Sequence, residues 1–206
     1  VLTFNIRYGT APDGPNHWSH RKDSVIDLIK RGDYDFVGLQ EALRFQIDEI
    51  RQALPHLQEI GVGREDGKQA GEYSAILYDG RRWRVVEQDT FWLSDTPTVP
   101  GSKSWGNNIP RIVTWGRFAE SASGGELYVF NTHFDHQSQP SREKSAALLA
   151  DRLAQREPRR PVVVTGDFNA AEDNPAIRLL KGESAGSPIR LLDTYRLRHP
   201  DAKEVG

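Results

Sequence analysis

Two residue types are missing from this chain of 206 residues, which contains neither cysteine nor methionine. The absence of cysteine excludes disulfide bonds and zinc sites built on thiolates, but it does not identify the cellular compartment. A metal ion bound by this chain must therefore be held by oxygen and nitrogen atoms.

Long apolar runs are also missing. No stretch approaches the ~20 consecutive apolar residues that a membrane-spanning helix needs, so no membrane segment is predicted. Hydrophobic residues make up 37% of the chain, and the mean hydropathy is −0.63. These values are typical of a soluble globular protein, and they fit a cytoplasmic and a secreted protein equally.

A strong charge of one sign is missing as well, since the formal net charge is −2. Nothing in this balance indicates a basic face, so strong nucleic-acid binding is not expected. A nuclease is not excluded, because a metal cleft can bind phosphate on an otherwise acidic protein. No repeat or linker divides the sequence, so residues 1–206 are expected to form a single domain, whose oligomeric state the sequence does not indicate.

The most informative stretch is Pro161–Asn169, with the sequence PVVVTGDFN. Its three valines predict a buried strand, which Gly166 interrupts. Asp167 and Asn169 are two residues apart, so both side chains lie on one side of an extended backbone, where they are suited to hold a metal ion or a water molecule. The alternative is an ordinary turn capped by Asp and Asn.

The same pattern, an apolar strand that ends on polar side chains, occurs three more times. The segments are residues 2–5 (LTFN), 35–41 (DFVGLQE) and 127–136 (LYVFNTHFDH). If the four strands share one sheet edge, their terminal Asn, Asp, Glu and His side chains meet in one cleft.

Four motifs, in this order, resemble those of the endonuclease/exonuclease/phosphatase superfamily, which has the DNase I-like fold. They are Thr3–Arg7, Leu39–Glu41, Asn131–His136 and Gly166–Ala170. The resemblance implies an α/β sandwich of four layers, with two mixed sheets flanked by helices. It also implies a metal-dependent phosphoesterase.

The resemblance further predicts a Ser-Asp-His motif after another strand, and the sequence ends at Gly206 without it. Val1 lies inside the first predicted strand. We therefore expect the chain to be part of a longer protein and to lack its C-terminal portion. Residues 1–206 alone are expected to fold poorly and to be at least ~10³-fold less active than the full-length chain.

Periodicity and turn residues predict the remaining elements. Helices are expected over residues 20–30, 45–54, 141–156 and 175–180, shorter strands over 73–78, 84–91, 112–118 and 127–130, and a last short element over 191–195. Val25, Leu28 and Ile29 are the expected buried face of the first helix, and Ser141 is the expected cap of the third.

The long loop over residues 92–110 contains Trp92 and Trp105. Loops of this length are often functional or mobile. We interpret both tryptophans as ordinary packing within the loop, with a wall of the substrate cleft as the alternative.

Oxygen-rich ligands favour Mg²⁺ or Mn²⁺ over zinc. Glu41 is the expected anchoring carboxylate, with Asn5 beside it, because Mg²⁺ often takes only one or two carboxylates and keeps most of its waters. The alternative for Glu41 is a carboxylate at the N-terminus of a helix that starts near Ala42.

Four residues are expected to act on the phosphate. Asp167 is expected to orient or deprotonate the attacking water, and Asn169 to hold a phosphate oxygen or the hydration shell of the metal. His133, kept protonated by a nearby Asp167, is expected to stabilise the developing charge or to protonate the leaving oxygen. Arg111 is expected to bind phosphate, unless it is an ordinary surface charge.

Three further residues are candidates for substrate binding. Tyr73 is expected in the cleft, and Asp135 and His136 follow His133 in a His-x-Asp-His sequence. This sequence has an alternative interpretation as a metal-binding motif.

The chain is therefore predicted to be a Mg²⁺- or Mn²⁺-dependent hydrolase of phosphate esters that works by in-line attack of water. Nucleic acid, a nucleotide, a phospholipid and a phosphosugar all remain open as substrates. The alternative is a non-catalytic protein that binds a phosphate ligand on the same scaffold.

Overall fold

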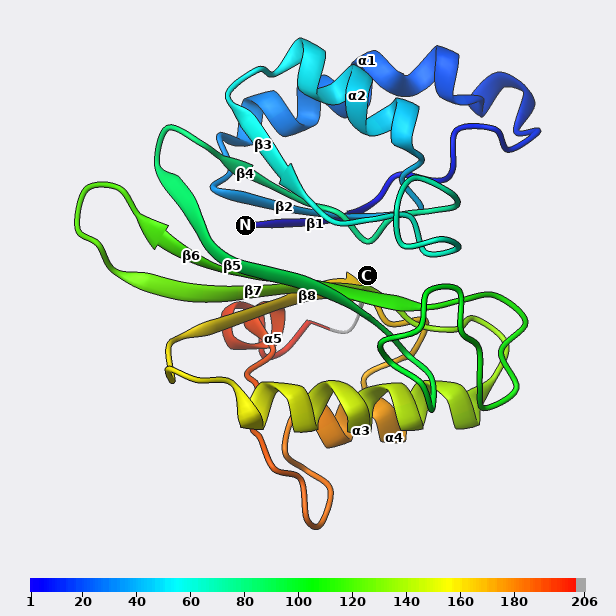
Figure 1. The fold of residues 1–206 in the computed structure, drawn as a ribbon, viewed down its shortest axis with the longest axis vertical. Helices are drawn as coiled ribbons and strands as arrows, with labels where there is room; N and C mark the ends of the chain where they lie inside the picture. The colour runs from blue at the N-terminus through cyan, green and yellow to red at the C-terminus, as the bar shows by residue number, and fades with distance from the viewer. Residues whose placement is uncertain (203–206) are drawn as a thin grey trace.

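The computed structural model describes residues 1–202, which form two four-stranded sheets with helices on their outer faces (Figure 1). In chain order the elements are β1 (Leu2–Asn5), the 3-10 turn η1 (Gly14–Asn16), α1 (Trp18–Gly32), β2 (Phe36–Gln40), α2 (Arg44–Ala53), β3 (Leu57–Ile60), β4 (Ile76–Asp79), β5 (Trp83–Trp92), β6 (Ile112–Glu120), β7 (Glu126–His133), α3 (Gln139–Gln155), β8 (Val162–Asp167), α4 (Pro175–Leu180) and α5 (Thr194–Arg198).

Both sheets are mixed. The first has the order β1-β2-β4-β3, in which only β1 and β2 are parallel. The second has the order β5-β6-β7-β8, in which only β7 and β8 are parallel. The parallel pairs arise because a helix connects their strands, α1 in one case and α3 in the other. This is the expected α/β sandwich of two mixed sheets flanked by helices.

Apolar side chains fill three layers, as a four-layer sandwich requires. Helices α1 and α2 cover the outer face of the first sheet, and α3 and α4 cover that of the second (Figure 1). Between the sheets lies a smaller cluster: Phe36, Ile60, Ile76, Phe118 and Val129. Strand alternation explains this division, because Phe36 faces the other sheet and Val37 packs in the helix-covered cluster.

The inter-sheet layer becomes polar toward the carboxyl ends of β2 and β7. Gly38 lies so close to the second sheet that a Cβ atom there would be 2.3 Å from Thr165 Oγ1 and 2.7 Å from Asn131 Oδ1. The buried Asn131 donates to the carbonyls of Leu39 (2.8 Å) and Ala75 (2.9 Å). Its Oδ1 accepts from Gln40 Nε2 at 2.7 Å and from Thr165 Oγ1 at 3.0 Å. Asn131 therefore joins the two sheets directly behind the polar strand ends.

We expect Asn131→Ala to lower the free energy of unfolding by ~2–4 kcal/mol, because buried partners in both sheets lose their hydrogen bonds. Urea denaturation measures this change. Asn108→Ala is the matched control, since Asn108 is exposed. Equal stability of the two variants would contradict a joining role for Asn131.

Several predicted boundaries are wrong in detail. Helix α1 begins at Trp18, and its buried side chains are Trp18, Val25 and Ile29. Leu28 is 38% exposed, because the buried stripe extends toward Ile26 rather than Leu28. Strand β3 was not predicted, because its four residues, LQEI, are too few for a recognisable strand pattern after Pro55.

The cap of α3 is also different from the prediction. The helix begins at Gln139, and Ser138 accepts the backbone N–H of Ser141 at 3.2 Å. Ser141 itself is fully buried within the helix, whose predicted stripe of Ala146, Leu149 and Leu153 is confirmed.

Three predicted strands or short elements also differ. The strand expected from residue 73 begins at Ile76, and Tyr73 forms only an isolated bridge with Ala42. The last short element is the helix Thr194–Arg198. The valines of β8 are half-buried rather than buried, because β8 is an outer strand of its sheet within residues 1–202.

Candidate active site

The polar strand ends meet between the two sheets. At the ends of β1 and β8, Asn5 Nδ2 donates to Asp167 Oδ2 at 3.0 Å and to Glu41 Oε1 at 3.0 Å. The four strands do not share one sheet edge, because β1 and β2 belong to one sheet and β7 and β8 to the other. The side chains still converge, since packing of the two sheets brings their carboxyl ends together.

Glu41 reaches this cluster through an uncommon backbone conformation. Alternation directs the buried Gln40 toward the opposite sheet, so an extended Glu41 would point away from it. Instead Glu41 has a φ of 60° and ends the strand, and its carboxylate contacts Asn5 and the backbone N–H of Tyr8 (3.3 Å). Helix α2 starts only at Arg44, so Glu41 is not the carboxylate of a helix that begins near Ala42.

Asp167 and Asn169 share a tight turn after β8. The backbone N–H of Asn169 donates to Asp167 Oδ1 at 3.0 Å, and Asn169 has a φ of 48°. Asn169 Nδ2 donates to the carbonyl of Phe134 at 3.0 Å. The turn predicted as an alternative is therefore present, and it leaves Asp167 Oδ2 directed at Asn5.

His133 lies next to Asp167, with 3.8 Å between His133 Nε2 and Asp167 Oδ2. Its side chain is buried, and its Nδ1 has no hydrogen-bond partner within residues 1–202. Burial, followed by the charge of Arg111, lowers the pKa of His133 to about 4, although Asp167 and Glu41 act in the opposite direction. The expectation of a protonated His133 is therefore wrong, because desolvation and a neighbouring cation outweigh the carboxylates.

A low pKa for His133 makes stability depend on pH. An unfolded histidine titrates near pH 6.5, so between about pH 6.5 and 4 the unfolded state binds the extra proton. Its contribution to stability is therefore complete above about pH 6.5 and is lost as pH falls toward 4, by ~1–3 kcal/mol.

Urea denaturation at several pH values in metal-free buffer checks this prediction. His133→Asn is expected to lose stability less steeply over that range than the unmodified chain, whereas the exposed His20→Asn is expected to follow it. Parallel curves for the unmodified chain and His133→Asn would contradict the low pKa.

Arg111 is a buried cation rather than a surface charge, with only 3% of its side chain exposed. Its Nη2 lies 2.9 Å from His136 Nδ1, and its Nε lies 3.6 Å from Asp135 Oδ2. Burial and the neighbouring Arg64 lower the pKa of Arg111, which stays charged at neutral pH. Its Nη1 has no hydrogen-bond partner in the described residues, whereas its Nε faces Asp135, so Nη1 is the donor suited to an anion.

The structure brings Asp135 and His136 to Arg111. Asp135 is 2% exposed and accepts the backbone N–H groups of Gln137 (2.9 Å) and Ser138 (2.7 Å), which lower its pKa against the effect of burial. His136 is exposed at the rim. Asp135 is therefore placed to orient Arg111 from behind.

Tyr73 is buried, and its hydroxyl donates to the carbonyl of Lys68 at 2.9 Å. It lines a small cleft together with residues from the loop before β4 and from the start of β6. The lining residues are Arg64, Glu72, Tyr73, Ser74, Pro110, Arg111, Ile112 and His133. The contribution of Arg64 was not predicted, because it lies in a charged, glycine-rich loop with no motif of its own.

The two loop tryptophans pack within the protein. Trp92 is 4% exposed and donates to the carbonyl of Arg64 at 2.7 Å. Trp105 donates to Asp95 at 2.8 Å and lies under the ammonium group of Lys144. Trp92 thereby ties the loop that precedes Arg111 to the loop that carries Arg64.

The oxygen donors at the strand ends fit Mg²⁺ or Mn²⁺ better than zinc. Within residues 1–202, no three His, Cys, Asp or Glu side chains converge as a preformed metal site. Glu41 and Asp167 instead both accept a hydrogen bond from Asn5 Nδ2, and Asn5 Oδ1 accepts the backbone N–H of Arg7 at 2.9 Å. A single carboxylate, Glu41, with the second lone pair of the Asn5 oxygen is a donor set for a cation that keeps most of its waters.

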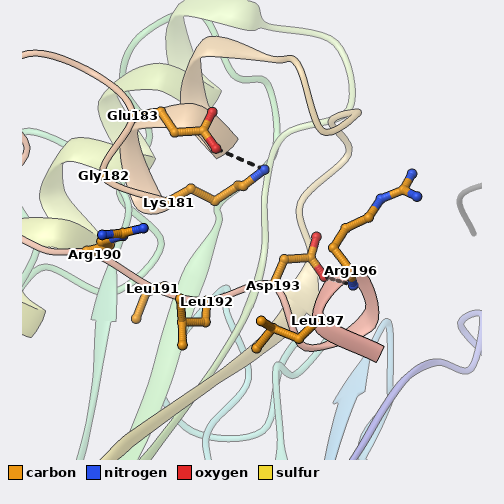
Figure 2. Close-up of a pocket in the computed structure, with 9 residues that line it drawn as sticks. All are labelled: Lys181, Gly182, Glu183, Arg190, Leu191, Leu192, Asp193, Arg196 and Leu197. Carbon is orange, nitrogen blue, oxygen red and sulfur yellow. Dashed lines mark hydrogen bonds and ion pairs between the residues drawn. The ribbon is translucent and has the colours of Figure 1, made fainter. Parts of the chain in front are cut away.

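A second cavity, of about 330 Å³, lies around α5 and the segment before it (Figure 2). Two of its charged side chains pair with neighbours, Lys181 with Glu183 at 3.0 Å and Arg196 with Glu172 at 2.7 Å. None of the strand-end side chains lines it. We therefore place the candidate site at the strand ends, where buried donors lack partners. No helix in the described part of the chain is long and apolar enough to span a membrane.

The fold is a DNase I-like α/β sandwich. Two mixed sheets pack together, helices cover their outer faces, and polar side chains converge where the parallel strands end. The sequence model of the Endonuclease/Exonuclease/phosphatase family matches residues 2–200. The chain belongs to this family.

Solved structures of similar chains agree with the family. An endonuclease/exonuclease/phosphatase from Bacteroides vulgatus is 40% identical with a TM-score of 0.84, over 87% of this chain and 69% of that one. A mannosyl-6-phosphatase from Bacteroides thetaiotaomicron is 36% identical with a TM-score of 0.83, over 86% and 68%. The human Nocturnin catalytic domain shares the fold at 17% identity and a TM-score of 0.75, over 98% and 73%.

A protein of Acanthamoeba polyphaga mimivirus is 29% identical over 179 residues, which are 82% of this chain. The chain spans 66% of the length of that relative, just under two thirds.

Proposed function

We propose that this chain is the core of a Mg²⁺- or Mn²⁺-dependent hydrolase of phosphate esters. The observation that carries the proposal is a cation and two carboxylates on either side of His133. Arg111, with a buried Nη1 that lacks a partner, lines one cleft with His133, and Asp167 lies 3.8 Å from His133 Nε2 and shares the Asn5 side chain with Glu41. Donors of this kind suit a phosphate, and the carboxylates suit a hard cation. The similarity to a phosphatase of known substrate supports the reaction class.

Glu41 and Asn5 are the residues that would hold the metal. When bound, the ion supplies positive charge that offsets the charge of the phosphate oxygens. Arg111 binds the phosphate through its unpartnered N–H groups, and Asp135 fixes the guanidinium from behind. His136 contacts the same guanidinium from the rim.

Asp167 orients or deprotonates the attacking water, because its carboxylate faces the site from the end of a rigid strand. Asn169 holds this carboxylate through its backbone N–H, and its side chain is the proposed contact to a phosphate oxygen or to the hydration shell of the metal. His133 is neutral at pH 7, so it stabilises the developing negative charge by donating a hydrogen bond and carries no positive charge of its own. Tyr73 forms a wall of the cleft.

A substrate panel tests the proposal. DNA, RNA, nucleotides, phosphoinositides, sphingomyelin and sugar phosphates are assayed for phosphate or alcohol release with Mg²⁺, with Mn²⁺ and with a chelator. Metal-dependent turnover of at least one ester is expected. Phosphate binding without turnover of any of them would instead support a non-catalytic binding protein.

A further inference from the structure

One buried glutamine near the site takes no part in the proposed chemistry. Gln46 lies in the first turn of α2 and is fully buried, with 0% of its surface exposed. A buried amide must be hydrogen-bonded, because an unpartnered polar group inside a protein is costly. The partners of Gln46 therefore indicate which part of the protein it holds.

The side chain of Gln46 makes three hydrogen bonds, all to backbone groups. Its Oε1 accepts the N–H of Leu43 at 3.0 Å, which caps α2. The same oxygen accepts the N–H of Gly9 at 2.8 Å, and Nε2 donates to the carbonyl of Arg7 at 3.0 Å. Helix capping needs only the first of these bonds, so the other two hold residues 7–9 against the helix.

Residues 7–9 are fixed in a conformation that their contacts enforce. Arg7 has a φ of 56°, in the left-handed region, which is strained for a residue with a side chain. Its N–H donates to Asn5 Oδ1 at 2.9 Å. Gly9 packs so tightly on α2 that a Cβ atom there would lie 2.8 Å from Gln46 Cδ. The segment is therefore held at one end by a residue of the site and at the other by α2.

This segment in turn holds the expected metal ligand, Glu41. The N–H of Tyr8 donates to Glu41 Oε2 at 3.3 Å, and Arg7 Nη1 lies 3.9 Å from the same oxygen. Asn5 Nδ2 donates to the other oxygen, Oε1, at 3.0 Å. The carboxylate is therefore oriented from two sides, and Gln46 supports one of them.

We propose that Gln46 is a positioning residue of the metal site. By holding the backbone of residues 7–9, it fixes the direction in which the Glu41 carboxylate faces the metal. The inference rests on the proposed function and deepens it, because it assigns a support to the metal ligand named there. Residues that orient a metal ligand typically contribute about 10–100-fold to metal affinity.

Gln46→Met tests the proposal, because methionine has a similar size and makes none of the three hydrogen bonds. Titration calorimetry is expected to show a Mg²⁺ affinity at least ~10-fold lower than that of the unmodified chain. Gln52→Met makes the same change at an exposed position of α2 and is expected to leave the affinity unchanged. Ile50→Ala removes buried apolar contacts one turn further along α2, so it is expected to lower stability without lowering Mg²⁺ affinity.

A kinetic measurement separates positioning from a general loosening of the fold. The Mg²⁺ concentration that gives half-maximal turnover is expected to rise ~10-fold or more in Gln46→Met, whereas kcat at saturating Mg²⁺ stays close to that of the unmodified chain. Where Gln46→Met does not fold, Gly9→Ala decides, since it keeps Gln46 and the cap of α2 but displaces residues 7–9 from the helix. The same loss of Mg²⁺ affinity is expected.

Unchanged Mg²⁺ affinity in Gln46→Met, or an equal loss of affinity in Ile50→Ala, would overturn the inference and leave the proposed function standing. A fall in kcat that saturating Mg²⁺ does not restore would do the same. Absence of Mg²⁺ and Mn²⁺ binding by the unmodified chain, together with absence of turnover, would instead overturn the proposed function itself.

Discussion

Asp167→Asn is expected to lower kcat on a phosphate ester by ~10²–10⁴-fold, the usual cost of losing a general base. The carboxylate lies at the end of β8, where Oδ2 accepts from Asn5 and Oδ1 accepts from the backbone of Asn169, both at 3.0 Å. Asn keeps the size of the side chain, but its single acceptor oxygen can keep only one of these two hydrogen bonds, and it cannot take a proton from water. The fold should therefore survive with a small loss of stability while the chemistry fails.

Steady-state kinetics with saturating Mg²⁺ measure this change on any ester identified by the substrate panel. Asp173→Asn is the matched control, because Asp173 is an exposed carboxylate a few residues further along the chain. An unfolding midpoint close to that of the unmodified chain would show that the loss is not structural. Near-full turnover in Asp167→Asn would show that its assigned role is wrong.

Glu41→Gln is expected to weaken Mg²⁺ binding by ~10²-fold or more. Loss of a group that only orients a metal ligand costs about 10–100-fold in affinity, so loss of the anchoring carboxylate should cost at least the upper end of that range. Gln can still accept the hydrogen bond that Asn5 donates to Glu41 at 3.0 Å, but it loses the longer one from the backbone N–H of Tyr8 at 3.3 Å, so the fold is expected to remain with a small loss of stability.

Titration calorimetry with Mg²⁺ in the absence of substrate measures the affinity directly. Glu65→Gln removes the same charge at an exposed position and is expected to leave the affinity unchanged. Raising the Mg²⁺ concentration should restore part of the activity of Glu41→Gln but none of that of Asp167→Asn, which separates metal binding from base catalysis. An unchanged Mg²⁺ affinity in Glu41→Gln would remove Glu41 from the metal site.

Much of the fold followed from local signals. Strands were predicted correctly at β2, β6, β7 and β8, from their runs of β-branched and aromatic residues. Helix α3 was predicted correctly from its apolar stripe, because a buried helix face imposes a strict period on its side chains. Predicted helix ends and buried faces were wrong where they depend on contacts with other parts of the fold. Ser138, and not Ser141, caps α3, and Leu28 lies outside the buried stripe that Trp18 and Val25 define.

Local sequence also determined which polar residues end the strands. Asn5, Glu41, His133 and Asp167 could be named from the chain alone, because each follows an apolar run and the four motifs recur in the order of a known family. Their identities implied a phosphate and a hard cation.

Only the tertiary structure decided how these residues meet and in what charge state. The strand ends come from two sheets, and their meeting depends on the packing of Gly38 against Asn131 and Thr165, contacts between residues far apart in the chain. His133 is neutral because burial and Arg111 outweigh Asp167, a balance set by surroundings that no single motif contains. The place of Arg64 beside Arg111 likewise follows from two loops held together by Trp92, since long-range packing leaves no period in the sequence.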